Sequence, residues 1–115
     1  MNRHTQLCRE IMIAIGAIPG VIVGANPTGL ATYTGDRGST WRVHYGWPSS
    51  EGGPDLLAVV APLGRLVALE VKTGSGRARP EQRAVHAALA AVGAVVAVVR
   101  SVDEARAAIE KARRP

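Results

Sequence analysis

Two carboxylates and one ammonium group follow one another in the middle of the sequence, at Asp55, Glu70 and Lys72. Glu70 and Lys72 are two residues apart in an apolar stretch that reads as a strand, so both side chains point to one face. Neighbouring carboxylates repel each other unless a cation lies between them. Mg²⁺ or Mn²⁺ suits this position, because it accepts carboxylate oxygens together with water and phosphate oxygen.

A cation held between these carboxylates supports hydrolysis at phosphorus. It lowers the pKa of a bound water and neutralises a phosphate in line with that water. Lys72 is expected to orient the water or to stabilise the negative charge that develops. The backbone carbonyl of Val71 is a further expected metal ligand, whereas the Val71 side chain is expected to point the opposite way, into the core.

The elements around these residues follow an α/β pattern. Leu7, Ile11 and Ile15 recur every four residues and predict a helix over residues 4–15, which ends at Gly16. Strands are expected at residues 21–23, 40–45, 55–61, 65–72 and 94–99, and two more helices at residues 80–92 and after the capping residue Ser101.

The segments between these elements are predicted to be loops. Residues 24–39 are rich in Gly, Asn, Pro and Thr and are expected to form a long loop, and residues 46–54 a second one. Residues 55–72 read as a hairpin turning at Pro62-Leu63-Gly64, which would bring Asp55 close to Glu70. The core is expected to be aliphatic, because the chain has no Phe, two Trp and two Tyr.

The charge of the chain favours an anionic partner. The formal net charge is +5, and such basicity suits nucleic acid or acidic lipid without choosing between them. Arginines flank the expected site and are candidate contacts to phosphate; a solvated face explains Arg77 equally well and is the preferred interpretation for the others. The flanking arginines are Arg37, Arg42, Arg77, Arg79 and Arg83.

The stretch from Gly52 to Ala105 resembles the VRR-NUC family of the PD-(D/E)XK nucleases. It reads GGPDLLAVVAPLGRLVALEVKTGSGRARPEQRAVHAALAAVGAVVAVVRSVDEA. The resemblance implies a restriction-endonuclease-like core, a central mixed β-sheet flanked by helices in the order αβββαβ. It also implies phosphodiester cleavage in DNA, with Asp55 and Glu70 holding metal, Lys72 serving the water and Gln82 supporting the site from its helix.

The first helix departs from this family's pattern. Members usually carry a Glu there that joins the metal site, and the alignment puts Gln6 or His4 near that position. Glu10 lies one turn after Gln6 and shares its helical face. Glu10 is therefore either a fifth catalytic residue and a metal ligand or an ordinary surface residue, and the sequence leaves both open.

Several other residue patterns argue against alternative sites. Residues 24–29 mimic a phosphate loop, but Leu30 stands where Lys is required, so no nucleotide cofactor is expected. The histidines and Cys8 show no zinc spacing and read as surface or partly buried residues. Trp41 and Trp47 could stack on bases, although packing under the long loop is the preferred interpretation.

The expected location is cytoplasmic, in a bacterium or as a phage protein in its host. Cys8 is the only cysteine, so no internal disulfide can form, which suits a reducing compartment. No signal peptide is expected, and the apolar stretch at residues 87–99 is too short to cross a bilayer.

The sequence thus favours a single nuclease domain over residues 1–115, dependent on Mg²⁺ or Mn²⁺ and selective for branched or flapped DNA or Holliday junctions. The alternative is a DNA-binding module without catalysis, or a subunit of a larger machine. A homodimer is expected, because so small a domain lacks accessory DNA-binding elements.

Overall fold

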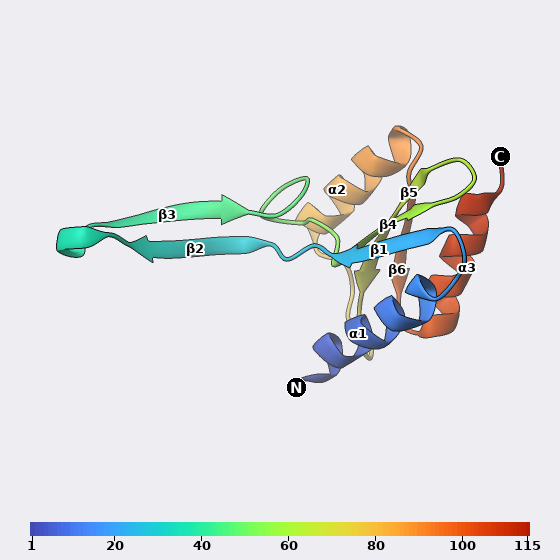
Figure 1. Ribbon diagram of the computed structural model, residues 1–115, viewed down its shortest axis with the longest axis horizontal. Helices are drawn as coiled ribbons and strands as arrows, with labels where there is room; N and C mark the ends of the chain where they lie inside the picture. The colour runs from blue at the N-terminus through green and yellow to red at the C-terminus, as the bar shows by residue number, and fades with distance from the viewer.

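The computed structural model describes residues 1–115 and shows a four-stranded sheet between helices (Figure 1). The strands are β1 (Val21–Ala25), β4 (Leu56–Val60), β5 (Arg65–Val71) and β6 (Val95–Val99), in the spatial order β1-β4-β5-β6. β4 is antiparallel to both β1 and β5, whereas β6 runs parallel to β5, so the sheet is mixed, as expected.

Two helices cover one face of the sheet and enclose the core. They are α1 (Arg3–Gly16) and α3 (Val102–Arg113), and they pack on each other and on the sheet. The buried side chains between them are all aliphatic, with Ile11, Ile15 and Ile109 completely buried. Helix α2 (Pro80–Ala91) lies on the opposite face against β6. The order α1, β1, β4, β5, α2, β6 confirms the predicted αβββαβ core.

Local sequence explains how these helices begin. The Asn2 side chain accepts a hydrogen bond from the Thr5 N–H at 2.8 Å and caps α1. Ser101 caps α3 by accepting from the Glu104 N–H at 3.1 Å, as its spacing predicted. The Glu104 carboxylate accepts in return from the N–H of Arg100, one residue before the cap. The ends of the predicted helices and core strands shift by at most two residues.

The prediction of a loop over residues 24–39 is wrong. Residues Gly29–Thr34 form β2, which pairs antiparallel with β3 (Thr40–Tyr45) in a separate two-stranded sheet. A short 3₁₀ turn, Asp36–Gly38, joins them, with Arg37 at a left-handed φ of 65°. The loop was expected because glycine, proline and asparagine are frequent in residues 24–39. Thr32, Tyr33 and Thr34 nevertheless favour a strand when β3 pairs with them.

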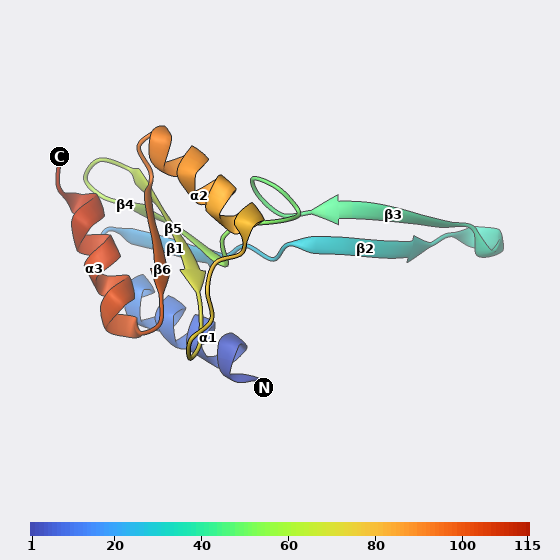
Figure 2. The same cartoon turned by 180° about the vertical axis from the view of Figure 1, so that it is seen from behind.

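The β2–β3 hairpin projects from the body of the molecule (Figures 1 and 2). The whole molecule, hairpin included, measures 54 × 32 × 28 Å. Asn26 closes its base: its side-chain amide donates to the carbonyls of Trp47 and Pro54, and its oxygen accepts from the Trp47 N–H. Trp41 and Trp47 are about half exposed, so neither is packed beneath a loop as expected. No helix of the structure is both long and apolar enough to cross a membrane.

Candidate active site

Asp55 and Glu70 lie side by side where β4 begins. The register of the two strands pairs Leu56 with Leu69, so the residue before β4 faces the residue after Leu69. The Asp55 carboxylate accepts a hydrogen bond from the Val71 N–H at 2.8 Å, which fastens it to the end of β5. The hairpin turn of β4 and β5 therefore brings the two carboxylates together, as the sequence predicted.

Glu70 is held in an unusual state for a carboxyl group. It is 2% exposed, and one of its side-chain oxygens, Oε2, is buried without a hydrogen-bond partner. Burial, and then the neighbouring Asp55, raise the pKa of Glu70 to about 8, against an opposing effect of Lys72 and Arg79. Lys72 Nζ lies 3.9 Å from Glu70 Oε1, on the same face of the strand.

Gln82 connects the start of α2 to this carboxyl group. Its amide nitrogen donates to Glu70 Oε1 at 3.1 Å, and its amide oxygen accepts from the Arg79 N–H at 2.8 Å. The bond to Glu70 is buried and shielded from water. Pro80 starts the helix two residues before Gln82, where the missing N–H costs nothing. Gln82 thereby fixes the orientation of Glu70.

A polar cleft of about 440 Å³ opens beside these residues, lined by Asp55, Glu70, Arg79 and Gln82 together with the 50–53 loop. Gly52 has a φ of 82°, and a Cβ there would lie 2.5 Å from the Glu81 carbonyl oxygen. Only glycine lets this loop pass so close to the first turn of α2. The glycines before Asp55 thus shape the wall of the cleft.

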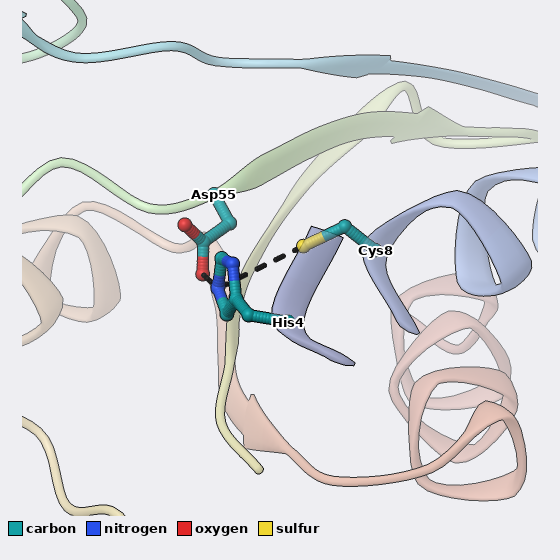
Figure 3. A group of neighbouring side chains, drawn as sticks. All are labelled: His4, Cys8 and Asp55. Atoms are coloured by element: carbon teal, nitrogen blue, oxygen red, sulfur yellow. Dashed lines mark hydrogen bonds and ion pairs between the residues drawn. The ribbon is translucent and has the colours of Figure 1, made fainter. Parts of the chain in front are cut away.

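Helix α1 presents two further polar side chains to Asp55 (Figure 3). His4 Nε2 lies 3.3 Å from Asp55 Oδ2, and Cys8 Sγ lies 3.8 Å from the same His4 nitrogen. The three donor atoms lie within 4.8 Å of one another, a spacing that a metal ion can bridge. Burial, then Asp55 and Glu70, raise the pKa of the Cys8 thiol to about 11.

Glu10 does not reach this group. It is exposed and lines a separate small depression with Arg3, Gln6 and Leu7. His4 and Cys8 are one turn apart on the buried face that continues to Ile11, whereas Glu10 lies about a third of a turn away around the helix. Of the residues that the alignment left open, only His4 meets Asp55, and the structure does not support Glu10 as a metal ligand.

By sequence, His4 and Cys8 read as surface or partly buried residues, although the resemblance put His4 or Gln6 near the family's first-helix ligand. Neither spacing nor composition showed that they meet Asp55, because the contact joins positions 51 residues apart. The one available signal was their spacing of four, in phase with the apolar stripe of α1. Arg100 was also missed: its guanidinium donates to the carbonyls of Gly74 and Gly76 and holds the loop before α2 in place.

The arginines predicted to contact phosphate lie in two places, near the cleft and on the projecting hairpin. Arg79 lines the cleft and forms an ion pair with Glu81 at 3.2 Å, and Arg77 is exposed in the same loop. Arg83 donates to the Ala78 carbonyl on the loop. Arg37 and Arg42 instead belong to the projecting hairpin, and the structure does not bring them to the cleft.

Comparisons with known proteins support the fold. No family model matches the sequence, and no curated protein matches it. A solved structure described as a VRR_NUC domain is similar, with a TM-score of 0.63 and 22% sequence identity, and the match covers 96% of this chain and 97% of that one. The chain therefore has the restriction-endonuclease-like fold of a VRR-NUC domain.

Proposed function

We propose that the protein is a metal-dependent DNA endonuclease whose active centre contains Asp55, Glu70 and Lys72. The observation that carries the proposal is Glu70, a buried carboxyl group beside a second carboxylate, with one oxygen left without a partner. A buried polar atom without a partner is costly in an ordinary structural site. A divalent cation would satisfy it and would neutralise the repulsion between Glu70 and Asp55.

The chemistry of the donor set suits such a cation. Asp55, Glu70 and the backbone carbonyl of Val71 would hold it through oxygen, and His4 would add an imidazole nitrogen from α1. Oxygen donors alone suit Mg²⁺, whereas a nitrogen donor favours a transition metal, so Mn²⁺ is the better fit of the two. When bound, the ion would activate a water and neutralise the phosphate.

The neighbouring side chains have separate tasks in this proposal. Lys72 is 18% exposed beside Glu70, so its ammonium can donate to the attacking water and stabilise the developing negative charge. The Val71 N–H holds Asp55, and Gln82 holds Glu70, so both carboxylates face the cleft. Arg79, and Arg77 beside it, would contact the phosphates that flank the bond being cut.

We extend the proposal to the form of the substrate and of the protein. The substrates would be branched or flapped DNA, including Holliday junctions, and the protein would work in the cytoplasm as a homodimer. Two copies present two cutting sites, which suits a branched substrate with more than one strand to cut. The basic charge of +5 supports binding to DNA before any site is engaged.

A panel of branched, flapped, nicked and linear DNA, incubated with and without Mn²⁺, tests the activity. We expect nicking that requires the metal and is lost in Asp55→Ala. Absence of metal-dependent nicking on every substrate would count against the proposal. The alternative of a DNA-binding module without catalysis is favoured by the first helix, which brings a histidine and no Glu to Asp55. Binding that survives EDTA, with no cleavage in any metal, would support it.

The metal preference has its own test. His4→Glu replaces the nitrogen donor by a carboxylate, so we expect Mg²⁺ affinity to rise relative to Mn²⁺ affinity. Calorimetric titration of each ion into the parent and the variant measures the ratio directly. Glu10→Gln, on another face of the same helix, is the control and should leave the ratio unchanged. An unchanged ratio in His4→Glu would remove His4 from the ligand set.

A further inference from the structure

The projecting β2–β3 hairpin has two faces of opposite character. In the antiparallel register, directly paired residues share a face: Tyr33 pairs with Trp41, and Ala31 with Val43. These pairs, with Tyr45 opposite Gly29, make one face apolar and aromatic. The other face holds the remaining residues of the two strands, which are Leu30, Thr32, Thr34, Thr40, Arg42 and His44.

The apolar face is flat and open to solvent. Tyr33 and Trp41 are each about half exposed, with exposed fractions of 50% and 51%. Their rings stack with centroids 5.9 Å apart and planes 18° from parallel. Gly29 lies directly under the Tyr45 ring, where a Cβ would come within 2.7 Å of the hydroxyl oxygen. The rings therefore lie against the ribbon instead of standing up from it.

Nothing in one copy of the chain covers this face. The two hairpin strands pack chiefly on each other, and no hairpin residue belongs to the buried core (Figures 1 and 2). A two-stranded hairpin is at best marginally stable alone in water, and it gains stability when a hydrophobic face is covered. A contiguous exposed apolar patch of this kind is typical of an interaction site.

We propose that the apolar face of the hairpin packs on the same face of a second copy, which gives a surface to the homodimer proposed above. The face carries no charged side chain, whereas Arg42 and His44 lie on the opposite face. DNA is held chiefly by cations at its phosphates, so it is the poorer occupant of the uncharged face. A self-complementary flat apolar face meets the requirement of a two-fold symmetric contact.

The aromatic side chains of the face provide most of the area that this role requires. A half-exposed tyrosine or tryptophan offers roughly 100 Å² of surface for burial. Tyr33, Trp41, Tyr45 and Val43 from two copies therefore bring together about 700 Å² of side-chain surface. Backbone and flanking contacts would have to contribute about 300 Å² more to reach the roughly 1,000 Å² at which specific interfaces begin. The faces with Arg42 would remain outward on the dimer, free to meet DNA.

Sedimentation velocity of the full chain, without metal or DNA, tests the proposal. We expect the parent to be a dimer at tens of micromolar. In Tyr33→Thr/Val43→Thr, the dissociation constant of the dimer should rise at least tenfold. Threonine keeps the strand propensity of both positions, and circular dichroism and thermal melting verify that the domain stays folded. Leu30→Thr, on the opposite face, is the matched control and should sediment like the parent.

A crosslinking measurement supports the same conclusion independently. In a Cys8→Ser background, Ala31→Cys and Thr32→Cys place a single thiol on the apolar and the opposite face. A short bis-maleimide should link two copies far more efficiently through position 31. Because neither measurement needs cleavage, they succeed or fail separately from the nuclease assay.

Five results would overturn the proposal. One is a parent that stays monomeric at every concentration, with or without DNA. Another is an unchanged dimer in Tyr33→Thr/Val43→Thr, and a third is equal crosslinking from both faces. The fourth is a monomeric parent whose DNA affinity falls in the double variant, which would make DNA the occupant. Val59→Thr, on the open face of the main sheet, would locate the interface there if it alone dissociated the dimer.

Discussion

Glu70 and Lys72 lie side by side, with Lys72 Nζ 3.9 Å from Glu70 Oε1, but the proposed mechanism gives them different tasks. Glu70→Gln keeps the shape of the side chain and removes the charge that the metal needs, so we expect Mn²⁺ affinity and cleavage to fall together. Lys72→Ala leaves both carboxylates, so metal should still bind while cleavage slows by about 10²–10³-fold. Calorimetry paired with single-turnover cleavage separates the two. If Lys72→Ala cleaves like the parent, our assignment of the active centre is wrong.

The raised pKa of Glu70 predicts how the metal-free protein responds to pH. An unfolded chain ionises this carboxyl near its ordinary value of 4.5, whereas the folded chain keeps the proton up to about 8. The folded state therefore binds more protons between these values, and stability falls as pH rises through that window. Urea unfolding across pH 5–8 with EDTA measures the slope.

The matched comparison for this pH dependence is Glu70→Gln, which should have the shallower slope. Burial and then Lys72 lower the pKa of His86, so this residue makes stability rise with pH, opposite to the effect of Glu70. Its effect is shared by both proteins and cancels in the difference between them. Identical slopes in the two proteins would show that Glu70 is already ionised in the folded, metal-free state.

At the scale of single elements, the 50–53 loop depends on a close approach to α2. Gly52→Ala adds a Cβ at 2.5 Å from a backbone oxygen and at a left-handed φ of 82°. We expect it to lower the free energy of unfolding by roughly 2–4 kcal/mol, as a strained backbone position with a clash. It should also disturb cleavage, because the loop lines the cleft. Urea titration and the cleavage assay measure both effects.

Gly74→Ala is the control for the Gly52 experiment. Gly74 also has a left-handed φ, of 57°, but a Cβ there would meet open space. Gly74→Ala should therefore lower the free energy of unfolding only by the backbone strain, about 1 kcal/mol. Equal losses for both variants would mean that the contact between the loop and α2 contributes nothing beyond the backbone conformation.

At the scale of the whole molecule, the β2–β3 hairpin contributes no residue to the buried core. Replacing residues 29–45 by a short Gly-Ser turn removes no residue of the buried core, and Asn26 can still bind Trp47 and Pro54. We expect metal binding and the secondary structure of the core to persist, while sedimentation shifts to the monomer. Mn²⁺ calorimetry and circular dichroism test the first part. Loss of folding would show that the hairpin stabilises the core.

The sequence by itself determined the elements of the core and the pairing of the two carboxylates. A strand buried on both faces needs a continuous apolar run, which identified β5. Two charged residues at a spacing of two in a strand share a face, so Glu70 and Lys72 could be found from the pattern alone. The hairpin turn after β4 then placed Asp55. These inferences use local rules that act over a few residues.

Only the tertiary structure decided which side of α1 meets Asp55. The contact of His4 and Cys8 with Asp55 depends on how α1 rotates as it buries Ile11 and Ile15, which no local pattern reports. The hairpin was hidden for a similar reason: β2 is rich in glycine and threonine, and its strand conformation is stabilised by pairing with β3. Long-range packing and strand pairing therefore completed the site and gave the molecule its projecting arm.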